Sequence, residues 1–179
     1  MKKIVLVCGA IAGLIAGGWA VFYIYLCSNK MDFDNGEIYG YTAMIVAFSL
    51  VFVGVKNYRD NNLHGQISFG KAFQVGILIV MVASTIYVVL WLIDYYCFIS
   101  NFAEIYTAHV LDKLKASGAS TVVIAKKAKE MAEFSRMYKN PFFNAIMTYC
   151  EIVPVGLIVA LLAALILKRK TKLNDTVTA

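Results

Sequence analysis

Apolar residues gather into four long blocks along the chain, and none of the blocks shows strict two-residue alternation. The blocks are residues 4–26, 38–55, 72–93 and 142–167, the last interrupted only by Glu151. At the helical rise of about 1.5 Å per residue, about 20 apolar residues cross a hydrocarbon layer about 30 Å thick. Because a backbone in lipid must satisfy its own hydrogen bonds, this pattern predicts an all-α fold, a bundle of four transmembrane helices.

The polar interval between the third and fourth blocks, at about residues 101–139, predicts an extramembrane amphipathic helical hairpin. Asn101 followed by Glu104 resembles a capping box, and Gly118 stands where a helix would stop. We therefore expect a first helix at about residues 102–117.

A second hairpin helix is expected at residues 121–138, where apolar side chains recur at three- and four-residue steps and charged ones take the other face. Two oppositely charged pairs stand four residues apart there, Lys126 with Glu130 and Lys129 with Glu133. Asn140 and Pro141 end the helix. Two interpretations stay open: the hairpin packs on its own bundle, or it presents a docking face to another protein.

The composition agrees with a single integral membrane domain over residues 1–179. Apolar residues make up 60% of the chain and charged residues 16%, against about a quarter charged in soluble domains. Lys2 and Lys3 ahead of the first block could also begin a cleaved export signal. The apolar run continues to Leu26, however, and we expect a retained helix.

The basic residues predict the orientation. With four spans, one side holds a cluster of cations: Lys2, Lys3, Lys56, Arg59, Lys71, Lys168, Arg169, Lys170 and Lys172. The first loop on the other side has only Lys30 among three acids, while the long polar interval at residues 100–141 adds seven basic and four acidic residues to that side. We expect a multi-pass protein of the bacterial cytoplasmic (inner) membrane with both termini in the cytoplasm. The net charge of +6 then indicates affinity for anionic lipid headgroups, and we expect no nucleic acid partner.

Small residues predict where helices approach closely. Gly9, Gly13 and Gly17 form a double G-x-x-x-G on the first helix. A similar face on the fourth helix consists of Gly156, Ala160 and Ala164. Spacing alone leaves open whether these faces pack within one chain or join two copies in a homo-oligomer.

Two acids in or near the spans are candidate ion or proton sites, Glu151 and Asp94. Helix length puts Asp94 at the outer surface and Glu151 a short way below it. Pro154 removes a backbone donor near Glu151, so a kink or a late helix start would let water reach the carboxylate. Alternatively, Glu151 pairs with a hairpin group: Arg136, Lys139 or a tyrosine hydroxyl.

One short stretch resembles a phosphate-binding loop, since Gly65, Gly70 and Lys71 stand at G-x-x-x-x-G-K spacing. The next residue is Ala72, where a magnesium-binding Ser or Thr is required, and a membrane span follows. We expect no nucleotide site. His64 and His109 fall on opposite sides, and the cysteines permit a disulfide without predicting one, so we expect no metal, no cofactor and no catalytic site.

Several stretches together resemble a family of four-helix membrane proteins of unknown function found in Bacteroidota, catalogued as domain of unknown function 4199. They are ISFGKAFQVG after GVKNYRD, the first-helix glycines, NPFF, and the closing VPVGLIVALLAALILKRK. The resemblance implies that the stretch starting at Ser68 marks the start of the third helix. Ser68 would cap the helix, Phe69 would anchor beside Gly70 in the headgroup layer, Lys71 would bind phosphate headgroups, and Gly76 would admit a neighbouring helix.

The family implies no activity. We expect a non-enzymatic scaffold or accessory protein of the cell envelope, in contact with the lipid bilayer and with a membrane-protein partner or a second copy. The alternative is a small proton- or ion-coupled permease or channel that uses Glu151. An intramembrane enzyme would have only Glu151, Asp94 and His109 as acid-base groups.

Overall fold

The computed structural model describes residues 1–26 and 33–169; Cys27, Lys30, Asp32, Lys170 and Lys172 lie outside the described residues. The regular elements in these ranges are six helices: α1 (Lys2–Leu26), α2 (Phe33–Asn62), α3 (Phe69–Cys97), α4 (Phe102–Ala116), α5 (Thr121–Tyr138) and α6 (Pro141–Leu167). Helices α1, α2, α3 and α6 are long and apolar enough to cross a membrane. The all-helical class and the four predicted spans are confirmed.

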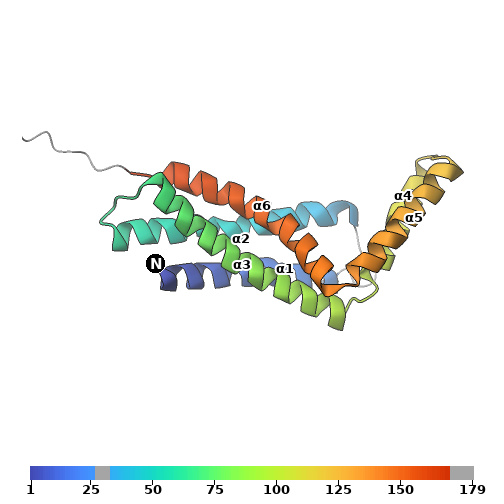
Figure 1. The fold of residues 1–179 in the computed structure, drawn as a ribbon, viewed down its shortest axis with the longest axis horizontal. Coiled ribbons are helices and arrows are strands. Elements are labelled where there is room, and N and C mark those ends of the chain that lie inside the picture. The colour runs from blue at the N-terminus through green and yellow to red at the C-terminus, as the bar shows by residue number, and fades with distance from the viewer. Residues whose placement is uncertain (27–32, 170–179) are drawn as a thin grey trace, which may run out of the picture.

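The four long helices run side by side, and the amino terminus lies at the same end as the close of α6 (Figure 1). Their outer surface is apolar: Ile45, Val46, Ile158 and Ile166 each expose more than half of their area. A soluble protein rarely exposes such a continuous apolar surface, whereas lipid solvates it without cost. The chain is therefore a membrane protein.

Helix α3 lies at the centre of the bundle, with α1 on one side and α6 on another. A Cβ added at Gly9 would lie 2.7 Å from Cβ of Val82, and one at Gly13 would lie 2.7 Å from the carbonyl oxygen of Ala83. Gly17 similarly faces Leu90. The backbones of α1 and α3 thus approach closely along the whole glycine stripe.

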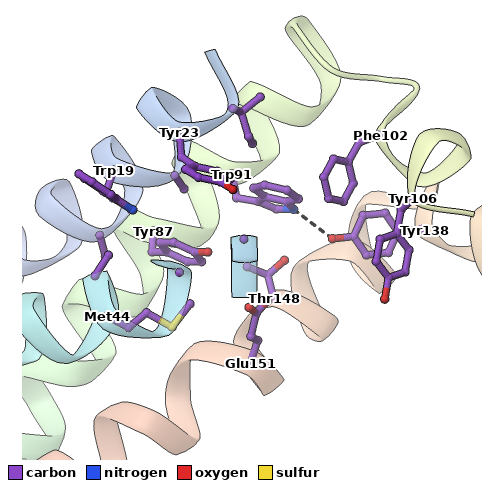
Figure 2. Close-up of a pocket in the computed structure, with 16 residues that line it drawn as sticks. Trp19, Tyr23, Met44, Tyr87, Trp91, Phe102, Tyr106, Tyr138, Thr148 and Glu151 are labelled. Atoms are coloured by element: carbon purple, nitrogen blue, oxygen red, sulfur yellow. Dashed lines mark hydrogen bonds between the residues drawn. The ribbon is translucent and has the colours of Figure 1, made fainter. Parts of the chain in front are cut away.

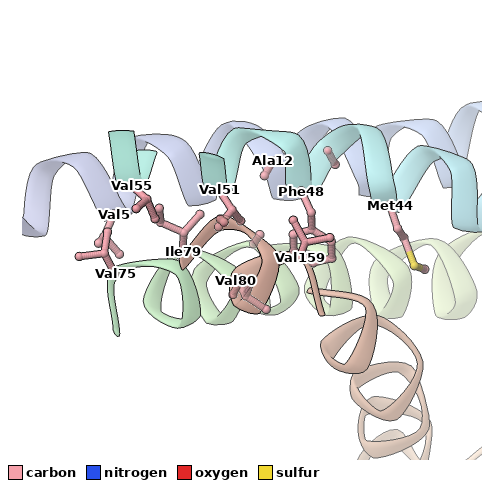
Figure 3. Close-up of a cluster of buried hydrophobic side chains, with 14 of the residues drawn as sticks. Val5, Ala12, Met44, Phe48, Val51, Val55, Val75, Ile79, Val80 and Val159 are labelled. Atoms are coloured by element: carbon pink, nitrogen blue, oxygen red, sulfur yellow. The ribbon is translucent and has the colours of Figure 1, made fainter. Parts of the chain in front are cut away.

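The small face of α6 also lies against α3. A Cβ at Gly156 would overlap the side chain of Val80, and one at Gly76 would lie 3.1 Å from Cβ of Ala160. Ala160 and Ala164 are fully buried. The two small-residue faces therefore pack within one chain, each against α3. Larger apolar residues from the four long helices fill the core between them (Figure 3).

The helices are longer than the apolar blocks. Helix α2 continues to Asn62, seven residues beyond the predicted end at position 55, and α3 starts at Phe69 and ends at Cys97. In α2 the extension carries Lys56 and Arg59. Backbone hydrogen bonds of the helix continue through these residues, although they lie outside the apolar block. Apolar blocks therefore mark the lipid-embedded part of each helix rather than its ends.

Backbone and side-chain hydrogen bonds connect the carboxyl end of α6 to the loop after α2. Ile67 and Arg169 exchange two backbone hydrogen bonds of 3.1 and 2.9 Å. The buried Arg59 guanidinium donates to the Leu167 carbonyl at 3.4 Å and pairs with Asp60 at 2.7 Å. A cation at the carboxyl end of a helix stabilises the exposed carbonyls there.

The hairpin of α4 and α5 projects away from the bundle at the end opposite the amino terminus (Figure 1). Both helices have nearly the predicted bounds. Gly118 has a φ of +75°, the left-handed conformation that glycine adopts most readily, and it makes the turn. At the base, Lys139 pairs with Glu104 at 2.9 Å and Thr107 bonds Ser135 at 3.1 Å.

The predicted capping box at Asn101 is wrong. Asn101 has a ψ of 6° and its side chain makes no capping hydrogen bond, while Glu104 turns to Lys139. Caps do form at Ser120 for α5 and at Asn140 for α6, where the side-chain oxygens accept backbone N–H groups. On α5, Lys127 pairs with Glu130 at 3.5 Å, three residues apart, whereas the sequence pointed to pairs four residues apart.

Candidate functional site

A cavity of about 230 Å³ lies at the end of the bundle from which the hairpin projects (Figure 2). Its wall is largely aromatic. Helix α1 supplies Trp19 and Tyr23, α3 supplies Tyr87 and Trp91, and the hairpin supplies Phe102, Tyr106 and Tyr138. The cavity therefore forms only where the bundle and the hairpin meet.

Hydrogen bonds from α6 and the hairpin hold the indole of Trp91 in this wall. Its Nε1 donates to Oδ1 of Asn144 at 3.0 Å and also lies 3.2 Å from the hydroxyl oxygen of Tyr138. Asn144 is fully buried, and the ring of Phe102 meets Trp91 in a T-shaped contact with centroids 5.4 Å apart. The orientation of Trp91 is thus fixed by α6, α4 and α5 together.

Tyr138 is neutral at physiological pH. Burial raises the pKa of its hydroxyl to about 12, although the hydrogen bond from Trp91 acts in the opposite direction. A tyrosine whose pKa is raised in this way keeps its proton, and its ring is an uncharged part of the wall.

Among the described residues, Glu151 is the one carboxylate in the cavity wall. No lysine or arginine lines the cavity in this part of the chain. It stands ten residues after Pro141 on α6, or about 15 Å along the helix axis. Thr148 lies one turn earlier on the same face, as i and i+3 positions do. In the view of Figure 2, Tyr87 lies on one side of Glu151 and Tyr138 on the other.

The two hairpin cations predicted as partners for Glu151, Arg136 and Lys139, line a separate groove with Glu104. Lys139 donates to Glu104, and this hydrogen bond raises the pKa of Lys139. The predicted late start of the helix near Pro154 is also wrong, because α6 is helical from Pro141 to Leu167 and Pro154 stands inside it. Glu151 instead lies among the tyrosines of the cavity, beside Tyr106 and Tyr138.

Asp94 does not join Glu151. It lies near the end of α3 and is buried, with 5% of its surface exposed. Its Oδ2 atom has no hydrogen-bond partner among the described residues. Asp94 lines a separate apolar groove with Leu14 and Phe22 of α1 and Phe98.

The stretch from Ser68 forms the start of α3, at the end of the bundle opposite the cavity. The Ser68 hydroxyl accepts the Lys71 backbone N–H at 3.3 Å, and the Lys71 ammonium bonds Gln74 at 3.0 Å. Phe69 is 38% exposed and stacks on Phe73, while Gly70 faces open space.

The remaining candidate groups do not converge. Cys8, Cys97 and Cys150 are free thiols. His64 lies in the connection after α2, and His109 lies on α4 in the hairpin. No group of three His, Cys, Asp or Glu side chains that could hold a metal occurs in the part of the chain that the structure describes.

Sequence reasoning identified Glu151 but missed the aromatic wall around it. Tyr87 and Trp91 are one turn apart on α3, and Thr148 and Glu151 are one turn apart on α6. Polar or amphipathic residues at this spacing inside two apolar spans indicate a shared polar face. That signal was present, whereas the contribution of Tyr106 and Tyr138 depends on how the hairpin is placed.

Comparison with known proteins gives a family. A family model described as a protein of unknown function, DUF4199, matches residues 8–169. No curated protein and no solved structure matches the chain.

Proposed function

The chain belongs to the family of proteins of unknown function DUF4199, and we propose that it is a non-enzymatic protein of the bacterial inner membrane that scaffolds other envelope proteins. In this proposal both termini face the cytoplasm and the α4–α5 hairpin is the contact element on the opposite side. The positive end of the bundle, with Lys2, Lys3, Lys56 and Lys71, supports this orientation.

The observation that carries the proposal is the projection of the hairpin away from the bundle (Figure 1). An extramembrane helix pair that served only to close the bundle would lie across its end and bury its apolar residues there. Here Val122 is 77% exposed and Val123 is 50% exposed, near the turn that is farthest from the bundle. Exposed apolar side chains at the tip of a projecting element favour a protein partner.

The charge beside these residues specifies the chemistry of the partner. A groove between α4 and α5 has an apolar floor that includes Val110, Leu114 and Val123. Three lysines, Lys113, Lys126 and Lys127, line this groove against a single acid, Glu130. We infer that the partner offers an acidic amphipathic segment, because charge complementarity guides the choice of partner.

Site-specific photo-cross-linking in native membranes tests this proposal. A cross-linking residue at position 122 should form a discrete protein adduct, and one at the lipid-facing position 166 should not. Lys126→Glu combined with Lys127→Glu should strongly reduce the adduct, whereas Lys129→Glu, outside the groove, should leave it unchanged. Adducts with lipid alone at position 122, or an adduct insensitive to the groove lysines, would contradict the proposal.

A second candidate function is a small proton- or ion-coupled permease or channel. Glu151 favours it, because it lies on a transmembrane helix and lines a cavity. Acidic side chains in such positions are a common feature of ion pathways. Proteoliposomes should then show a flux that Glu151→Gln abolishes and Glu104→Gln retains. Equal flux in wild type and Glu151→Gln would remove this candidate.

A further inference from the structure

The aromatic cavity has the composition of a site for an organic cation. Seven of its lining side chains are aromatic, and its one charged residue among those described is the acid Glu151. The face of an aromatic ring carries negative electrostatic potential, which attracts an ammonium group within about 6 Å of the ring centre. The aromatic rings and the carboxylate thus both attract a positive charge. Among the described lining residues no lysine or arginine is present to pair with an anion.

The volume and the donor set favour a small organic cation over a larger ligand or a divalent metal. About 230 Å³ is below the range of about 300–1,000 Å³ typical of pockets for larger ligands, so the occupant is a small group. A divalent metal needs several oxygen, nitrogen or sulfur ligands, and Glu151 supplies the one carboxylate of this wall. An alkylammonium group needs a single counter-ion and apolar faces for its carbon atoms.

The wall is held in place before any ligand binds. Trp91 is fixed by hydrogen bonds of 3.0 Å to Asn144 and 3.2 Å to Tyr138. Tyr138 packs against Tyr95 and Phe134 with ring centroids 5.4 Å apart in each case. Rings that are already ordered lose little entropy when they enclose a ligand.

A neighbouring groove adjoins the cavity. Phe102, Tyr106, Tyr138, Thr148 and Glu151 line both hollows, and the groove continues past Tyr41 of α2. Glu151 therefore stands at the boundary between the two hollows, where it can face a cation in either one. The groove lies between the hairpin and the bundle, since Phe134 of α5 and Met147 of α6 also line it.

We propose that this cavity binds an alkylammonium group, with Glu151 as its counter-ion and with Tyr87, Trp91 and Tyr106 as ring faces around it. The source is a dissolved amine or the headgroup of an aminophospholipid, which share this chemistry. The proposal is independent of the hairpin function above, because it concerns a different set of residues.

Intrinsic fluorescence reads this site directly, since the chain has two tryptophans and both line the cavity. The purified full-length protein is titrated with tetramethylammonium chloride or ethanolamine hydrochloride, with sodium chloride at equal ionic strength as the reference. We expect a saturable change in emission with the ammonium probes only. In a Trp19→Phe variant the change persists, because Trp91 alone reports it.

Matched variants separate binding from folding. Glu151→Gln should weaken binding by about tenfold or more, since it removes the counter-ion, and Tyr106→Leu should weaken it by a smaller factor. Glu104→Gln, which removes an exposed acid at the hairpin base, should leave the affinity unchanged. Circular dichroism and gel filtration establish that each variant is folded.

A second arm identifies the source of the ammonium group. The protein is placed in nanodiscs of phosphatidylglycerol with or without phosphatidylethanolamine. A Glu151-dependent emission change on adding phosphatidylethanolamine supports a lipid headgroup, and a response confined to the dissolved probes supports a soluble amine. The proposal is overturned if no ammonium probe gives a saturable response, if sodium gives the same response, or if Glu151→Gln and Tyr106→Leu both bind as the wild type does.

Discussion

At the scale of single residues, glycines with the same chemistry occupy opposite environments on α1. A Cβ at Gly13 would lie 2.7 Å from both the Ala83 carbonyl oxygen and Cβ of Ile86, whereas a Cβ at Gly18 would meet nothing within 4 Å. Backbone atoms of α3 cannot move away as the end of a flexible side chain can. The role of a glycine here therefore depends on the face of the helix that carries it.

We predict that Gly13→Ala and Gly18→Ala change stability in opposite directions. Gly13→Ala should destabilise the protein by about 1–3 kcal/mol, because it overpacks the contact between α1 and α3. Gly18→Ala should be neutral or stabilising by up to about 1 kcal/mol, because alanine loses less conformational entropy in a helix. Unfolding midpoints in a mild detergent measure both. Equal losses for the two variants would contradict this packing.

The sequence predicted the role of single residues where residue spacing alone determines it. It did not predict burial, which depends on neighbours from other segments. The glycine spacing on α1 identified a close helix contact, but only the structure gives α3 as its partner. Asp94 lies near the end of its helix as expected, yet it is buried, because neighbours from other segments cover it. Helix length predicts depth along the axis but not which side faces the core.

At the scale of elements, two helix starts with similar sequence signals differ in their caps. Ser68 has an extended conformation, with a ψ of 156°, and accepts a hydrogen bond from Lys71, whereas Asn101 has a ψ of 6° and makes no such bond. An N-cap side chain reaches the helix N–H groups only from the extended conformation. Asn101 instead lies inside a turn closed by a hydrogen bond of 2.8 Å from the Phe102 N–H to the Ile99 carbonyl.

We predict that Ser68→Ala destabilises the first turn of α3 by about 0.5–2 kcal/mol and that Asn101→Ala has little effect on α4. Hydrogen exchange of the backbone amides near Lys71 and near Glu104 measures the two local effects. Faster exchange at α4 in Asn101→Ala, with none at α3 in Ser68→Ala, would reverse the assignment of caps.

The hairpin helices were predictable almost to the residue because local signals determine them. Charged and apolar residues alternate at helical spacing over 121–138, and Gly118 makes the turn with its positive φ. Their direction relative to the bundle was not predictable, since it depends on contacts such as Trp91 with Phe102 and Tyr95 with Tyr138. The aromatic cavity was missed for this reason, because it exists only once the hairpin is placed.

At the scale of the whole molecule, the two ends of the bundle differ in character. One end carries the amino terminus and the start of α3, together with Lys2, Lys3, Lys56 and Lys71. The other end carries the aromatic cavity and the projecting hairpin. Under the positive-inside rule we expect the basic end in the cytoplasm, and in the proposed orientation a ligand or partner would meet the cavity and hairpin from outside the cytoplasm. The proposed functions share this orientation.

Cysteine accessibility in intact cells tests that orientation most directly. In a background with Cys8, Cys27, Cys97 and Cys150 replaced by alanine, single cysteines are introduced as Val122→Cys at the hairpin tip and Asn61→Cys at the basic end. A membrane-impermeant maleimide should label Val122→Cys before lysis and Asn61→Cys only after lysis. Labelling of Asn61→Cys in intact cells, with Val122→Cys protected until lysis, would contradict the account.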